Sequence, residues 1–188
     1  MLKPMDRNNA ALLTPKEWLH YYEYLNKDYQ AICLALLHTG MRVEEMRELM
    51  RNRDWYKPSN RAIFLPKSAI KKVKTRHKER HIILTEDGCH AIEALFVRDP
   101  TIPSRQAMTC TLKRAAVTAN IDPTNIVPKM FRKMIISWLV STGDYSELVI
   151  AASAGHTLET MKDHYLGLAF KKSDVEDMRK FLKGWGEA

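Results

Sequence analysis

The chain has 188 residues, 45% of them hydrophobic, with 7 Gly and 8 Pro, which is enough for one core and too little for two large domains. Thirty Lys and Arg against 22 Asp and Glu give a net charge of +8, and this excess favours polyanionic partners, with nucleic acid first among them. Three distant cysteines argue against a disulfide framework or a zinc site. A signal core and an apolar run of roughly 18 residues are both missing, so we expect a cytoplasmic protein.

The first third of the chain is predicted to be helical. Residues 1–13 have the character of a tail or a linker remnant. A capping-box pattern at 14–17, with proline in the first helical position, marks the expected start of the domain. Apolar periodicity then predicts two helices that end at Gly40 and a shorter helix over 43–50.

The middle of the chain changes to short β-prone runs. Three of them, at 62–65, 69–73 and 81–84, are separated by turn-prone residues and predict a small antiparallel sheet. A strongly basic stretch over 71–81 lies at the expected tip of this sheet. Such a density of positive charge favours contact with phosphate, although a solvated basic loop would look the same.

Helices dominate the rest of the chain. Capping residues and periodicity predict helices over 85–97, 104–119, 130–140, 144–153 and 158–165, and a last helix that opens at 173–176. The whole pattern therefore predicts a mainly α domain with a small three-stranded antiparallel β-sheet.

Residues suited to phosphate chemistry occur in two separate segments of the domain. Arg42 follows Thr39, Gly40 and Met41 just before an expected helix, and Glu45 comes three residues later. Lys129 and Arg132 stand at positions i and i+3 of a helix start, so both side chains project from one face and could reach the same phosphate. Taken alone, Arg42 could instead be an exposed arginine of a helix-opening loop.

A Gly-His pair precedes a tyrosine near the end of the chain. His156 follows Gly155, and Tyr165 lies nine residues after His156. Cutting a phosphodiester without a metal requires cations on the phosphate oxygens, an aligned nucleophile and an acid for the leaving oxygen. Arginine suits the first task through its planar fork, and tyrosine suits the second because its phosphate ester stores the bond energy for rejoining. Individually, His156 could be a capping or core histidine and Tyr165 an ordinary packing residue.

In this order, the residues resemble the active site of tyrosine recombinases, or phage integrases. That family carries an arginine after a Thr-Gly turn, a hairpin lysine, an H-x-x-R pair, a Gly-His pair and a nucleophilic tyrosine about nine residues later. The segment from Gly155 through Thr160 to Tyr165 is the most specific match. Lys129 departs from the pattern, because the family usually has histidine there; integrases of the archaeal-viral type resemble this chain in having K-x-x-R. Lysine is less suited than histidine to act as a base near neutral pH.

The resemblance implies the tyrosine recombinase catalytic-domain fold over residues 14–170. It also implies an enzyme, a site-specific DNA recombinase or integrase that cleaves and rejoins DNA for a mobile element or viral genome. In this scheme Tyr165 forms a 3′-phosphotyrosyl intermediate, Lys74 protonates the leaving oxygen, and no metal or other cofactor takes part. The charge developing on the phosphate is assigned to Arg42, Arg132 and His156.

The hairpin lysine of the family is matched best by Lys74, with Lys72 as the alternative. Glu45 is expected to orient Arg42 or the neighbouring helix and not to react. The neighbouring basic residues are expected to bind DNA: Lys71, Lys72, Arg76, Lys78 and Arg80.

The expected partners are double-stranded DNA attachment sites, with a homo-tetramer on DNA and a monomer in its absence. Residues 171–188 form a C-terminal helix and tail that could dock on a neighbouring protomer or pack on their own core. Two other functions remain open from the sequence: a type IB topoisomerase-like enzyme, and a non-catalytic DNA-binding protein on a recombinase scaffold.

Overall fold

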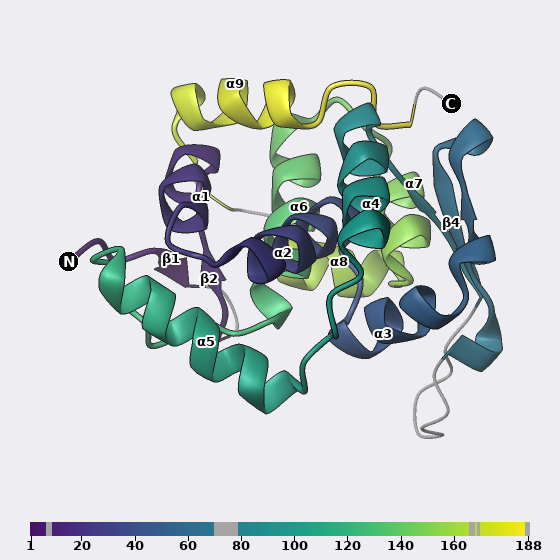
Figure 1. The fold of residues 1–188 in the computed structure, drawn as a ribbon. Helices are drawn as coiled ribbons and strands as arrows, with labels where there is room; N and C mark the ends of the chain where they lie inside the picture. Colours follow the sequence, from purple (N-terminus) through teal and green to yellow (C-terminus); the bar gives the residue numbers. More distant parts are fainter. Residues whose placement is uncertain (7–8, 70–78, 166–167, 169, 187–188) are drawn as a thin grey trace.

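The computed structural model describes residues 1–6, 9–69, 79–165, 168 and 170–186 (Figure 1). Its helices are α1 Pro15–Tyr22, α2 Lys27–Thr39, α3 Val43–Arg51, α4 Glu86–Arg98, α5 Arg105–Thr118, α6 Lys129–Thr142, α7 Glu147–Ala154, α8 Leu158–Tyr165 and α9 Lys172–Phe181. Its strands are β1 Met5–Asp6, β2 Ala11–Leu12, β3 Tyr56–Lys57, β4 Ala62–Leu65 and β5 Arg80–Ile83. The expected fold class, mainly α with a three-stranded antiparallel sheet, is confirmed.

Helix α6 lies at the centre of the molecule. It packs against α2, α7, α8 and α9 and against β2, and most of its residues are buried. Trp138, which is fully buried, donates a hydrogen bond from Nε1 to the Leu13 carbonyl at 3.1 Å. The first turn of α6, which carries Lys129 and Arg132, is thereby fixed relative to the rest of the core.

The three-stranded sheet has the order β3-β4-β5, and both pairs are antiparallel. Ile63 faces Ile82 in the register of β4 and β5, and both side chains are buried. One expected strand is different: at 69–73, Ala69 belongs to a 3-10 turn and residues 70–73 lie outside the described part of the chain. The third strand is instead β3, which pairs with the other edge of β4.

The segment expected to be a tail at 1–13 is part of the fold. Strands β1 and β2 form an antiparallel pair, and residues 10–13 are fully buried in the core. The Ala11 amide also donates a hydrogen bond to the Asn125 carbonyl at 2.9 Å. The domain therefore includes residues before Thr14, and the expected boundary is wrong by several positions.

The C-terminal helix α9 packs on α1 and α6 of its own chain. Met178 of α9 is buried, as are Leu182 and Trp185 after the helix, and Figure 1 shows α9 lying across the ends of α1 and α6. This arrangement agrees with the alternative of packing on the chain's own core, and docking on a neighbouring protomer stays a prediction. Within the described residues, no helix has both the length and the apolar character needed to cross a membrane.

Candidate active site

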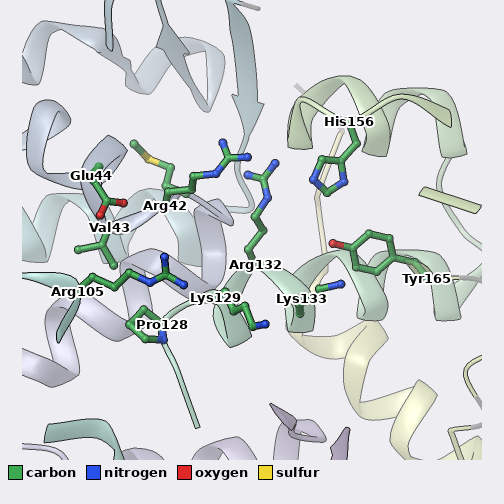
Figure 2. A pocket seen from close by; sticks show the side chains of 11 residues that line it. Arg42, Val43, Glu44, Arg105, Pro128, Lys129, Arg132, Lys133, His156 and Tyr165 are labelled. Atoms are coloured by element: carbon green, nitrogen blue, oxygen red, sulfur yellow. The ribbon is translucent and has the colours of Figure 1, made fainter. Parts of the chain in front are cut away.

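A cleft of about 250 Å³ lies between α3, α5, α6, α8 and the turn that follows α7 (Figure 2). Residues that the sequence singled out line it from four different segments: Arg42, Lys129, Arg132, His156 and Tyr165. Arg105 and Lys133 also line the cleft, and the sequence analysis missed both. Among the described residues, no group of three or more His, Cys, Asp or Glu side chains could hold a metal ion.

The position of Arg42 follows from the turn that precedes it. Gly40 ends α2 with a left-handed backbone, φ +59°, and an added Cβ would lie 3.0 Å from Ile135 Cγ2, so glycine is required there for both reasons. Arg42 then occupies the N-cap of α3. Its side chain is 42% exposed and extends into the cleft.

A buried carboxylate holds Arg42 in place. Glu45 is completely buried and accepts hydrogen bonds from the Arg42 backbone amide at 2.7 Å and from Arg42 Nη1 at 3.0 Å. Burial alone would raise the pKa of the Glu45 carboxyl, but attraction to Arg80 and then Arg132 outweighs it, and the net pKa is lowered. Glu45 is therefore ionised at neutral pH, in agreement with its expected role of orienting Arg42.

Arg80 is the second cation on this carboxylate, which corrects its assignment as a DNA contact. Its side chain is only 7% exposed, and Nη2 donates to Glu45 Oε2 at 2.9 Å. Its Nε donates to the carbonyl of Ser153 in α7 at 3.2 Å. Arg80 thus faces the interior and links β5 to α3 and α7. Its guanidinium is used on these internal partners.

Arg132 is buried beside Arg42 and is held by two backbone carbonyls. Its Nη1 donates to the Gly40 carbonyl at 2.9 Å, and its Nη2 donates to the Ala154 carbonyl. Burial lowers the pKa of Arg132 to about 10, while Glu45 raises it and Arg42 and Arg80 lower it further. The guanidinium stays charged at neutral pH. Repulsion between Arg132 and Arg42, whose guanidinium groups lie side by side in Figure 2, would be relieved by an anion.

His156 reaches the cleft from the turn after α7. Gly155 ends α7 with φ +66°, and an added Cβ there would lie 2.9 Å from Arg80 Cδ. Burial, followed by the charges of Arg132 and Arg42, lowers the pKa of His156 to about 3, so the ring is neutral at pH 7. Its Nδ1 is buried without a hydrogen-bond partner among the described residues. His156 is therefore a neutral hydrogen-bonding group in the absence of a ligand.

Tyr165 is the last residue of α8, and only 2% of it is exposed. Its ring stacks on that of His156, with centroids 5.9 Å apart and planes at 23°. Burial raises the pKa of the Tyr165 phenol, and the charges of Arg132 and Arg42 act in the opposite direction. Figure 2 shows its hydroxyl directed into the cleft, toward Arg132 and Lys133. The side chain therefore lies where a bound phosphate could meet it.

The remaining basic residues of interest fall into two groups, the lysines of α6 and the residues expected at the tip of the sheet. Lys129, the first residue of α6, is exposed and lines the cleft one turn before Arg132. Lys133 could have been found from its spacing, because it is four residues after Lys129 on a predicted helix. Five basic residues that were expected at the tip of the sheet lie outside the described part of the chain: Lys71, Lys72, Lys74, Arg76 and Lys78.

Solved structures with the same architecture show what the fold is. The chain superposes on XerA recombinase with a TM-score of 0.64 and 17% identity, covering 96% of this chain and 67% of that one. It superposes on the Tn1549 transposon integrase (residues 82–397) in complex with circular intermediate DNA with a TM-score of 0.67 and 16% identity, covering 90% and 67%. The chain has the fold of a tyrosine recombinase catalytic domain.

The fold that the resemblance implied is thus confirmed. A further structure of the Tn1549 integrase, in complex with transposon right-end DNA, has a TM-score of 0.65 and 16% identity, covering 92% of this chain and 65% of that one. The chain therefore spans about two thirds of the length of the chains in these solved structures. No protein-family model and no curated protein sequence matches it.

Proposed function

We propose that the chain is a site-specific DNA recombinase that cleaves and rejoins DNA through a 3′-phosphotyrosyl intermediate. The observation that carries this proposal is the convergence of four side chains on one cleft. They come from segments far apart in the sequence: Arg42, Arg132, His156 and Tyr165. A protein that only binds DNA would have no use for a buried tyrosine hydroxyl directed at a pair of arginines.

The two arginines are suited to hold the scissile phosphate. A guanidinium has five N–H donors, and Arg132 uses two of them on the carbonyls of Gly40 and Ala154. Arg42 uses one on Glu45. The remaining donors can bind the non-bridging oxygens, and they are fixed before the substrate arrives, which is the arrangement that stabilises charge most effectively.

Neutral His156 complements these cations. Because its pKa is about 3 in the empty cleft, the imidazole adds no third positive charge beside Arg42 and Arg132. One of its nitrogens can donate a hydrogen bond to a phosphate oxygen. A bound phosphate would in turn raise the pKa of His156, because an anion favours the charged form of the ring.

The reaction is a transesterification that needs no outside energy source. The Tyr165 oxygen attacks phosphorus, the phenolic proton is lost to solvent, and the bond from phosphorus to the 5′ oxygen breaks. That oxygen takes up a proton and leaves as a 5′ hydroxyl; we assign the donor to Lys74, which lies outside the described residues. Rejoining is the reverse, with a 5′ hydroxyl attacking the phosphotyrosine.

We further propose double-stranded DNA attachment sites as substrates and a homo-tetramer on two such sites as the active assembly. The Tn1549 integrase is seen in complex with DNA, and the net charge of +8 on this chain suits the same class of partner. Integration or excision of a mobile element is the corresponding biological role. Recombinant products from paired sites would separate it from a type IB topoisomerase, which would relax supercoiled DNA without exchanging strands.

The first test uses nicked duplexes with a randomised sequence around the nick, without magnesium. Wild type should form a protein–DNA adduct that resists SDS, and sequencing of the trapped DNA should reveal the preferred site. Tyr165→Phe should form no adduct. Tyr24→Phe, which removes the same hydroxyl from an exposed tyrosine, should behave as wild type. An adduct formed by Tyr165→Phe would overturn the assignment of the nucleophile, and DNA binding without any adduct would favour a non-catalytic role.

A further inference from the structure

Lys133 lies against the candidate nucleophile, although no sequence motif assigns it a role. It follows Arg132 directly on α6 and is half-buried. Its Nζ lies over the Tyr165 ring, 5.0 Å from the centroid. A cation within about 6 Å of an aromatic ring is attracted to the ring face. In Figure 2, His156 lies above Tyr165 and Lys133 lies below it, so the two side chains border the phenol from different directions.

Tyr165 is surrounded by more cations than anions. Arg42 lies on its side of the cleft at the start of α3, and Arg132 and Lys133 on α6, while His156 from the turn after α7 is neutral. Three more charged groups line the same cleft from α3, α5 and α6: Glu44, Arg105 and Lys129. The charged residues of α8 itself are Glu159, Lys162 and Asp163, whose backbone positions precede Tyr165 on the helix.

Binding of a phosphate changes this balance. Arg42 and Arg132 are the groups placed to bind the phosphate oxygens, so a bound diester, which carries one negative charge, would offset part of their positive charge. The same anion disfavours ionisation of a neighbouring phenol, because like charges repel. A third cation close to the phenol would favour its ionised form. Lys133, which contacts the ring, is placed for that task.

We infer that Lys133 is a positioning residue for Tyr165, holding its ring in the cleft and favouring the phenolate that attacks phosphorus. The part of this inference that concerns attack on DNA rests on the proposed function. Lys133 takes no proton in this scheme; the phenolic proton still leaves to solvent. The contact with the ring exists without DNA, and its effect on the phenol can therefore be measured on the free protein.

The first experiment measures the ionisation of Tyr165 directly. All tyrosines are replaced by fluorotyrosine, and the fluorine NMR signal that is missing from Tyr165→Phe identifies residue 165. In Lys133→Met the titration midpoint of this signal should rise by about one pH unit, as expected when a nearby opposite charge is removed. Lys133→Arg, which keeps the charge, should restore the wild-type midpoint.

A matched control removes the same charge elsewhere. Lys180 lies on α9 and is paired with Asp177 at the surface, so Lys180→Met changes the net charge without touching the cleft. Its Tyr165 midpoint should equal that of wild type. An unchanged midpoint in Lys133→Met would overturn the inference, and so would an equal shift in Lys180→Met.

The second experiment measures adduct formation on nicked DNA as a function of pH. Below the phenol midpoint, Lys133→Met should react about tenfold more slowly, because one pKa unit is a tenfold change in phenolate, and the deficit should shrink as the pH rises. Lys133→Arg should restore the profile. A deficit of equal size at every pH would contradict the inference. If wild type forms no adduct on any DNA, the proposed function fails, while the titration still decides the role of Lys133.

Discussion

On the arginine side of the cleft, Arg42 and Arg132 are held by hydrogen bonds. On the tyrosine side, His156 and Lys133 contact the aromatic ring of Tyr165. Arg132 is fixed by two backbone carbonyls, and Arg42 is fixed by the buried carboxylate of Glu45. Tyr165 instead contacts His156 and Lys133 through its aromatic face. The side that would bind the phosphate is therefore organised by hydrogen bonds, and on the other side the ring of Tyr165 packs against His156 and Lys133.

The supporting helices differ in the same way. Helix α6, which carries Arg132, has 14 residues, and most of them are buried. Helix α8, which carries Tyr165, has 8 residues and packs on α6 and α7. Groups that stabilise charge work best when they need no rearrangement, whereas a nucleophile must approach its target. The contrast in packing suits these two tasks, and it can be tested by removing parts from each side.

The largest expected effect comes from removing the carboxylate behind the arginines. Glu45→Ala would leave buried Arg80 without its counter-charge, and the loss of one partner of a buried ion pair costs about 3–5 kcal/mol. The free energy of unfolding, measured by chemical denaturation, should fall by that amount. Glu44→Ala, at the exposed neighbouring position, should change it by less than about 0.5 kcal/mol. Equal losses in both variants would show that Glu45 does not anchor this side.

The next effect should appear in the chemistry and much less in the stability. Arg42 is 42% exposed, so Arg42→Ala should lower the free energy of unfolding by about 1 kcal/mol or less. Loss of one charge-stabilising donor should slow adduct formation by about 10²–10³-fold. Arg51→Ala, an exposed arginine of the same helix, is the control and should retain the wild-type rate. A variant of Arg42 that reacts as fast as wild type would remove it from the site.

The smallest effect concerns the pH dependence of stability on the tyrosine side. The pKa of His156 is lowered from 6.5 to about 3, so between these values the unfolded chain binds a proton that the folded chain does not. Stability must therefore fall as the pH drops below about 6.5. His156→Gln should show a shallower loss of stability between about pH 7 and about pH 5, where carboxylates stay mostly ionised. Part of the loss should remain, because burial also lowers the pKa of His38, to about 4.

Denaturation of wild type, His156→Gln and His90→Gln at several pH values measures this slope. His90 is exposed on α4 and serves as the matched substitution. If His156→Gln kept the full slope of wild type, the histidine would not be held neutral by the fold.

Helix boundaries were the most predictable part of the fold. The capping box at Thr14 and Glu17 and the caps at Thr85 and Ser104 are present as expected, because capping depends on residues close in sequence. Strand β3 was missed because two residues are too few to show a period-2 pattern. The burial of residues 10–13 depends on contacts with Asn125 and Trp138, which no local pattern reveals.

The candidate site, too, could be predicted only where its residues follow a pattern along the sequence. The order and spacing of Arg42, Arg132, His156 and Tyr165 placed four residues that the structure brings to one cleft. Arg80 was misassigned because it lies in a basic stretch that favoured contact with phosphate, whereas its partner Glu45 is 35 residues away in the sequence. A long-range ion pair of this kind is invisible until the chain is folded.

Gly155 explains why a short pattern could reveal this site when overall sequence similarity could not. Its left-handed backbone and the 2.9 Å approach of Arg80 to the site of an added Cβ leave no room for another side chain. Any larger residue would press on the arginine that steadies Glu45, which in turn steadies Arg42. The glycine before the histidine is thus a local sequence feature that tertiary packing favours. Searches of unfamiliar sequences for this fold should weigh it together with the reactive residues.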